Sequence, residues 1–320
     1  MKIVVLDGGV LNPGDLSWGG LEQLGEVAVY DNSAPDQVVE RLKDADVAIS
    51  NKVALGESLF SQCPNLKFIG VTATGYNIVD LDAACAHNIA VSNVPTYGTS
   101  TVAQFTTALM LELCNRVGEH DVDVHAGGWS KSSDWCYWLR PMIEVTGKNV
   151  GIIGYGRIGQ AFGAVAQALG MNVLACSEGP QNAPENPQLR YVDLETLYAE
   201  ADVISLHCPL TPETKGMINR AALQKMKKSV LLLNASRGDL VNEADLAEAL
   251  NEGRIAGAAV DVLSKEPPSA DNPLLSAKNC IITPHIAWAS VEARGRILST
   301  TVDNVKAFIS GVSQNRVDQK

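Results

Sequence analysis

Short apolar runs alternate with segments of helical period along the first third of the chain. Runs rich in valine, isoleucine and phenylalanine predict strands at residues 2–6, 27–30, 47–50, 68–71 and 89–91. Between them lie helix-length segments, including candidate helices at residues 35–43 and 81–86. Strands that are separated by helices in this way favour a parallel sheet that is covered on both faces.

A second alternation begins at residue 149. It predicts strands at residues 149–153, 172–176, 203–207, 230–234, 256–260 and 280–283. Helical segments separate these strands, for example at residues 157–169 and 243–251, and further helical runs cover residues 99–117 and 291–309. Six strands in this arrangement are typical of a complete dinucleotide-binding domain. We therefore predict an α/β protein with two doubly wound parallel-sheet domains.

The composition supports packed domains and narrows the class of partner. Of the 320 residues, 46% are hydrophobic and 19% are charged, which argues against a disordered chain. The net charge of −11 repels nucleic acid and anionic lipid, so we expect neither as a partner. No apolar run approaches the ~20 residues of a membrane span. The apolar N-terminus soon meets Asp7, which indicates a first strand rather than a secretory signal.

The spacing of the cysteines bears on the cellular compartment, and the spacing of the histidines bears on metal binding. The seven cysteines are dispersed and form no Cys-x-x-Cys pair, which indicates buried thiols in a cytoplasmic protein. The five histidines lack metal-ligand spacing, so we predict no metal site.

The strand at residues 149–153 ends in a Gly-x-Gly-x-x-Gly turn. Gly154 would allow a tight turn, Gly156 would let the backbone approach a pyrophosphate, and Gly159 would let the following helix pack against the sheet. The N-terminus of that helix would then attract the phosphates. A methyltransferase-like nucleotide site and a purely structural turn are the alternatives.

The end of the next strand bears on the choice of dinucleotide. Glu178 lies 19 residues after Gly159, near the place of the acid that binds the ribose 2′-OH in NAD sites. No lysine or arginine lies between Gly159 and Arg190, so a 2′-phosphate would lack its usual cation. These features favour NAD over NADP, although Glu178 could also be a solvated loop acid.

Three chemically coherent side chains follow late strands, namely Arg237, Glu266 and His285. Ligands of an open parallel sheet bind at this edge. A guanidinium can hold a carboxylate through two hydrogen bonds, an imidazole can exchange a proton at neutral pH, and a carboxylate can orient that imidazole and favour its protonated form. Together they would reduce a 2-oxo acid. Taken singly, each could be a surface ion-pair partner, a loop acid or a packed histidine.

Five segments occur in a fixed order along the chain. They are Gly154-x-Gly156-Arg157-Ile158-Gly159, His207-Cys-Pro-Leu210-Thr-Pro-Glu-Thr214, Asn234-Ala-Ser-Arg237-Gly238, Asp261 with Glu266-Pro267, and Thr283-Pro-His285. Together they resemble the D-isomer-specific 2-hydroxyacid dehydrogenase family. The resemblance implies hydride transfer between NAD(H) and C2 of a small D-2-hydroxy acid or 2-oxo acid. It also implies that Arg237, Glu266 and His285 are catalytic.

The resemblance further implies a division of labour between the domains. Residues 1–98 and 288–320 would form a flavodoxin-like substrate domain, and residues 99–287 a Rossmann NAD-binding domain. Besides the glycine turn, the implied dinucleotide contacts are Thr74, Arg157, Ile158, Cys208, Ala235, Ser236, Arg237, Asp261 and His285. The acidic ribose position of the family aligns with Ser177, one residue before Glu178.

Substrate contacts are expected in both domains. The loop at residues 71–77 resembles the family segment whose backbone amides hold the substrate carboxylate, so we expect Ala73, Thr74 and Gly75 to join Arg237 and His285 at the substrate. Trp288 could wall the substrate pocket or belong to the core.

Within the family the chain resembles the glycerate dehydrogenases, also called hydroxypyruvate reductases. The phrase Gly70-Val-Thr-Ala-Thr-Gly-Tyr-Asn77 and a tryptophan-rich loop at residues 129–138 suggest this branch, and hydroxypyruvate, D-glycerate or glyoxylate as substrates. That loop could equally be a subunit contact, and the long helix from Thr99 resembles the element that supports a homodimer.

Two other functions stay open at this point. D-lactate or phosphoglycerate dehydrogenases are alternative enzymes of the same family. Dinucleotide-sensing corepressors are a different class, but they would need no working active site, whereas Arg237, Glu266 and His285 are all present.

Overall fold

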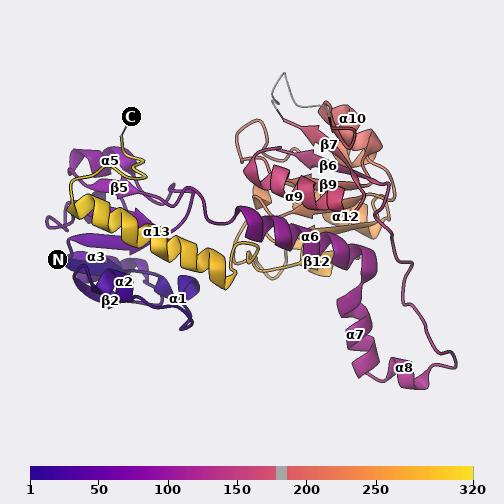
Figure 1. Ribbon diagram of the computed structural model, residues 1–320, viewed down its shortest axis with the longest axis horizontal. Helices are drawn as coiled ribbons and strands as arrows, with labels where there is room; N and C mark the ends of the chain where they lie inside the picture. The colour runs from indigo at the N-terminus through magenta and orange to yellow at the C-terminus, as the bar shows by residue number, and fades with distance from the viewer. Residues whose placement is uncertain (178–185, 320) are drawn as a thin grey trace. The chain divides into compact units, whose positions relative to one another are not determined.

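The computed structural model describes residues 1–177 and 186–319. The chain forms two compact units, one of Met1–Gly98 with Trp288–Lys320 and one of Thr99–Ala287 (Figure 1). In the described part of the chain, no helix is both long and apolar enough to cross a membrane.

The first unit is built on a five-stranded parallel sheet, as its apolar runs predict. The strand order is β2-β1-β3-β4-β5, the flavodoxin-like order. The strands are β1 (Lys2–Val5), β2 (Glu26–Val29), β3 (Val47–Ser50), β4 (Phe68–Val71) and β5 (Ala90–Ser92). The helices are α1 (Gly8–Leu11), α2 (Gly19–Glu22), α3 (Val38–Leu42), α4 (Glu57–Phe60), α5 (Leu81–Ala86) and α13 (Val291–Ile309). The helix expected at residues 35–43 begins instead as a 3-10 turn, Pro35–Gln37.

Helix α13 returns from the end of the chain to this unit. It packs on β4, where the rings of Phe68 and Phe308 stack at a centroid distance of 4.8 Å. Its inward positions, such as Ile297 and Val305, are fully buried. The helical period read from the sequence therefore marks a face that covers the sheet.

The second unit holds a seven-stranded parallel sheet in the order β12-β11-β10-β9-β6-β7-β8. The strands are β6 (Asn149–Ile153), β7 (Asn172–Cys176), β8 (Leu189–Tyr191), β9 (Val203–Leu206), β10 (Leu231–Asn234), β11 (Gly257–Val260) and β12 (Cys280–Ile282). The helices are α6 (Thr99–Asn115), α7 (Val117–His125), α8 (Gly128–Lys131), α9 (Arg157–Ala168), α10 (Leu194–Glu200), α11 (Arg220–Lys225) and α12 (Glu243–Asn251). The two α/β units confirm the predicted fold class.

Strand β8 corrects the prediction of six strands. It is a three-residue edge strand with no fully buried side chain, and among the described strands it pairs with β7 alone. Such a run lacks the continuous apolar pattern that identifies buried parallel strands. It occupies the third place of the Rossmann strand order, so the sheet is the complete doubly wound form.

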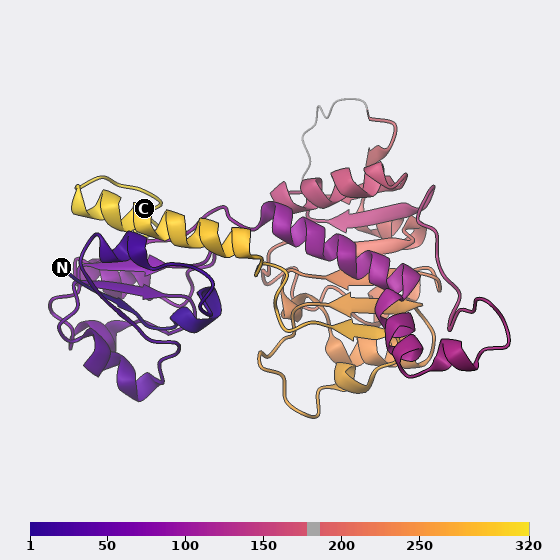
Figure 2. The ribbon, with the colours of Figure 1, turned by 60° about the horizontal axis from the view of Figure 1, so that its bottom comes forward.

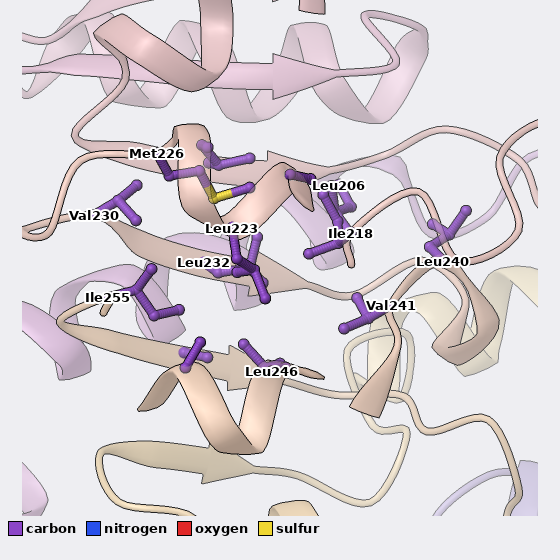
Figure 3. Close-up of a cluster of buried hydrophobic side chains, with 14 of the residues drawn as sticks. Leu206, Ile218, Leu223, Met226, Val230, Leu232, Leu240, Val241, Leu246 and Ile255 are labelled. Atoms are coloured by element: carbon purple, nitrogen blue, oxygen red, sulfur yellow. The ribbon is translucent and has the colours of Figure 1, made fainter. Parts of the chain in front are cut away.

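Buried side chains cover both faces of this sheet. On one face, Leu206, Leu232, Ile218 and Leu246 belong to a cluster between the strands and helices α10 to α12 (Figure 3). On the other face α6 lies across the strands, with Leu109 and Leu113 buried (Figure 2).

Helix α6 ends before the predicted residue 117, because Arg116 adopts a left-handed conformation with φ of 54°. A separate helix, α7, follows at once.

Candidate active site

The glycine turn has the geometry that its sequence predicts. Gly154 has φ of 92°, and a Cβ there would lie 2.5 Å from the amide nitrogen of Cys208. A Cβ on Gly159 would lie 2.4 Å from the carbonyl oxygen of Gly154, which explains the close approach of α9 to β6. A Cβ on Gly156 would meet no atom within 4 Å. The space beside Gly156 is open, as a bound pyrophosphate would require.

The N-terminus of α9 meets the electrostatic requirement for a phosphate group. This helix has 12 residues, and its N-cap Gly156 contributes no side chain to the amides of the first turn. Those N–H groups and the helix dipole would attract an anion. The turn therefore fits a dinucleotide, with Arg157 and Ile158 opening the helix.

The position at which an acid is expected to bind the ribose lies just beyond β7. Ser177 is exposed just beyond the end of β7. Glu178, the acid expected there, lies outside the described residues.

The loops after β9 and β10 are tied together beside the glycine turn. The Ser236 hydroxyl donates to the carbonyl of Cys208 at 2.7 Å. The buried Asn234 side chain accepts from the Ser236 amide at 3.1 Å and donates to the carbonyl of Arg237 at 2.9 Å. Cys208, Ala235, Ser236 and Arg237 thus lie on two linked loops. Asn234 was not predicted as a site residue, but its side chain holds this loop in place. A polar amide at the end of an otherwise apolar strand is the sequence feature that could have indicated this role.

His207 lies half-buried just beyond the end of β9. Its Nε2 lies 2.8 Å from the Ser205 hydroxyl, and its ring packs near Phe162. Burial lowers the pKa of His207 to about 4, so this imidazole is neutral at neutral pH.

Arg237 presents an exposed guanidinium at the exit of β10. One of its Nη atoms donates to the carbonyl of Ser236 at 2.7 Å. Among residues 1–177 and 186–319, no carboxylate forms an ion pair with it, which disfavours the simple ion-pair interpretation. The next residue, Gly238, permits a close loop contact, because a Cβ there would lie 1.9 Å from the carbonyl carbon of Leu263.

His285 and Glu266 form a direct pair. The imidazole Nδ1 lies 2.6 Å from a carboxylate oxygen of Glu266, and the two side chains are 33% and 35% exposed. The other carboxylate oxygen accepts from the Leu263 amide at 3.1 Å. Because Nδ1 donates to the carboxylate, Nε2 is the ring nitrogen that this pair leaves free for another partner.

Asp261 anchors the loop that carries His285. This carboxylate is 1% exposed and accepts from the Thr283 hydroxyl at 2.6 Å, the Ile286 amide at 2.9 Å and the Ala287 amide at 2.8 Å. Between these anchors, His285 has φ of 56°, a conformation that non-glycine residues rarely adopt. The loop therefore holds the imidazole in a position that the backbone alone would not favour.

The expected substrate residues of the first unit lie on the loop after β4 and at the start of its C-terminal segment. Ala73 and Gly75 are half-buried and Thr74 is exposed. The Thr74 hydroxyl donates to the carbonyl of Val94 at 2.9 Å. Trp288 packs edge-on against Tyr97, with ring centroids 6.4 Å apart, beside a small apolar cluster that includes Ile297. In the described residues, no group of three or more His, Cys, Asp or Glu side chains is arranged to hold a metal.

Comparison with known proteins places this geometry in a family. Residues 107–287 match the family model of the D-isomer specific 2-hydroxyacid dehydrogenase NAD binding domain. The chain belongs to this family. The D-2-hydroxyacid dehydrogenase is therefore an oxidoreductase with the family's NAD-binding domain, as the five sequence segments predict.

Full-length relatives agree with this assignment. The dehydrogenase is 53% identical over 322 residues to a hydroxypyruvate reductase of Blautia hydrogenotrophica, with complete coverage of both chains. It is 44% identical to a glycerate dehydrogenase of Methylorubrum extorquens over 89% of each chain. Among solved structures, a protein of Thermus thermophilus is similar with a TM-score of 0.86 and 33% identity, over 99% of this chain and 100% of the other.

Proposed function

We propose that this dehydrogenase reduces hydroxypyruvate to D-glycerate, with glyoxylate as a second substrate. The main observation in support of this reaction is the pairing of His285 with Glu266, whose Nδ1 and carboxylate oxygen lie 2.6 Å apart. The choice of substrate is supported by the relatives named hydroxypyruvate reductase, glycerate dehydrogenase and glyoxylate reductase.

The three catalytic side chains would divide the work as follows. Arg237 binds the carboxylate of the oxo acid through its guanidinium. His285 gives the proton on Nε2 to the carbonyl oxygen at C2, and Glu266 stabilises the positive imidazolium before that transfer. A nicotinamide cofactor, when bound, supplies the hydride for C2. In the oxidative direction, His285 takes the proton from the 2-hydroxyl group.

We assign cofactor binding to residues 99–287 and substrate binding to residues 1–98 and 288–320. The open turn at Gly156 and the linked loops at Cys208 and Ser236 support the first assignment. The loop at Thr74 supports the second.

NAD(H) is the proposed cofactor, in preference to NADP(H). The chain between Gly159 and Arg190 contains no lysine or arginine to pair with a 2′-phosphate. Arg190 itself forms an ion pair with Glu200. A higher kcat/KM with NADPH than with NADH would refute this preference.

A homodimer is proposed from the exposed apolar surface of α7 and the segment after it. Helix α7 contains no buried residue, and its Val122 is 70% exposed. Beyond α8, the apolar Trp135 is 85% exposed. A short helix gains most of its stability from packing, so a second copy of the chain is the proposed cover. Dilution of the protein in sedimentation velocity should then show a reversible monomer–dimer equilibrium, and Trp135→Ser should weaken it.

A cytoplasmic location is proposed from the thiols. All seven cysteines are free, which supports a reducing compartment. The expectation of buried thiols holds for Cys63, Cys114 and Cys208 but is wrong for Cys85 and Cys136, which are exposed.

The deciding experiment follows NADH oxidation with hydroxypyruvate, glyoxylate, pyruvate and 2-oxoisocaproate. The highest kcat/KM is expected with hydroxypyruvate. A preference for pyruvate, or faster NAD reduction with 3-phosphoglycerate than with D-glycerate, would favour the D-lactate or phosphoglycerate dehydrogenases. Turnover of none of these acids would refute the enzyme and favour a corepressor-like binding protein.

A further inference from the structure

Three consecutive carbonyl groups of the loop after β4 are held by donors from other segments of the first unit. The side-chain amide of Asn51 donates to the carbonyl of Thr72 at 2.9 Å. The backbone amide of Val94 donates to the carbonyl of Ala73 at 3.0 Å. The side-chain amide of Asn93 donates to the carbonyl of Thr74 at 2.8 Å.

These contacts also fix the direction of three N–H groups. A trans peptide is planar, so the N–H of one residue points away from the carbonyl of the residue before it. Holding the Thr72, Ala73 and Thr74 carbonyls therefore orients the N–H groups of Ala73, Thr74 and Gly75. Within the described residues, none of these three N–H groups donates to a protein acceptor. They are available to an anion.

Both asparagines are themselves held in place. The Asp7 carboxylate, after β1, accepts from the backbone amide of Asn51 at 2.9 Å and 3.0 Å. The same carboxylate accepts from the Lys52 amide at 2.6 Å. Asn93 is 7% exposed, and its carbonyl accepts from the buried Asn304 side chain at 2.9 Å. The exits of β1, β3 and β5 are thus tied to the loop that leaves β4 between them.

We propose that Asn51 and Asn93 are positioning residues that aim the N–H groups of Ala73 and Gly75 at the carboxylate of the substrate. This inference rests on the proposed function, because it takes a 2-oxo acid as the anion. Asn51 acts on the Ala73 amide and Asn93 on the Gly75 amide, so each can be tested separately. The Asn51 side-chain amide donates to both the carbonyl and the hydroxyl of Thr72, and Asn93 is 7% exposed, so each acts through the loop.

The experiment compares Asn51→Ala and Asn93→Ala with a matched control, Gln62→Ala. The Gln62 amide also donates to a backbone carbonyl, that of Ser58 at 2.6 Å, but it lies on the segment that leads into the amino end of β4. A lost neutral hydrogen bond changes binding by about three- to tenfold. We expect the KM for hydroxypyruvate to rise by about this factor in each asparagine variant, with kcat and the KM for NADH unchanged, because the interaction is equal in ground and transition states.

A second measurement separates this inference from the proposed function. Oxalate, a dianion of similar size, is titrated calorimetrically into each protein in the presence of NADH. Weaker oxalate binding in the asparagine variants, with normal binding in Gln62→Ala, would support the inference even if hydroxypyruvate were not turned over. Wild-type turnover with unchanged KM and oxalate affinity in Asn51→Ala would overturn the inference and leave the function standing. A parallel fall in kcat, NADH affinity and melting temperature would also overturn it, since that pattern indicates general damage. If Asn93→Ala does not fold, Asn51→Ala decides.

Discussion

Replacing Asp261 by asparagine should disable the enzyme through the loop of His285. Asparagine can keep one oxygen facing the Thr283 hydroxyl and the Ile286 amide, but its NH2 group then faces the amide of Ala287. That contact changes from a charge-assisted hydrogen bond of 2.8 Å to two donors facing each other. Such a bond contributes about 1.5–3 kcal/mol, and a buried amide left unpaired costs about 1–3 kcal/mol. We expect the free energy of unfolding to fall by about 2–4 kcal/mol.

The same change should lower kcat by about 10²-fold. The left-handed backbone of His285 costs roughly 1–2 kcal/mol, which the Asp261 contacts offset. With a weaker anchor the loop can relax and displace the imidazole, and a shift of about 1 Å is enough for a loss of that size. The assay is steady-state NADH oxidation by hydroxypyruvate, with denaturant unfolding measured on the same samples.

Asp202→Asn is the matched control. Its carboxylate also accepts a backbone amide, that of Asn149 at 2.9 Å, and pairs with Lys227 at 2.9 Å. It precedes β9, so it lies at the amino edge of the same sheet, opposite the active site. It should lose stability but keep kcat. Normal kcat in Asp261→Asn, or an equal fall in kcat in both variants, would refute the role of Asp261 in placing His285.

Four further outcomes are expected. His285→Ala should lower kcat by about 10²–10⁴-fold while NADH binding, measured by fluorescence, is retained; near-normal turnover would remove His285 from catalysis. Arg237→Lys should raise the KM of the oxo acid, because lysine lacks the two-pronged geometry of a guanidinium; an unchanged KM would argue against carboxylate binding there. Glu266→Gln should lower kcat by about tenfold or more, because it keeps a hydrogen-bond acceptor but removes the negative charge beside the imidazolium; wild-type kcat would show that the charge is unnecessary. Burial lowers the pKa of His207 to about 4, whereas the pKa of a histidine in the unfolded chain is near 6.5. The free energy of unfolding should therefore be highest above about pH 6.5 and fall by about 3 kcal/mol as the pH drops to about 4. Denaturant titrations should find this fall reduced in His207→Gln.

The sequence alone determined the two parallel sheets and the dinucleotide turn. Both are local patterns. Branched apolar runs separated by helical periods specify buried strands with crossover helices, and the spacing of Gly154, Gly156 and Gly159 specifies one strand–turn–helix geometry. Strand β8 was not predicted, because an edge strand of three residues has no such apolar pattern.

The tertiary structure decided how the functional groups are held. His285 pairs with Glu266 because the loops after β11 and β12 leave neighbouring strands at one edge of the sheet. Strand order likewise decides that Asp261 is buried. It also decides that Asn51 and Asn93 reach the carbonyl groups of the loop after β4 with their hydrogen bonds. Residues far apart in the sequence share a hydrogen bond only when the sheet places their strand ends side by side, and no local period encodes that neighbourhood.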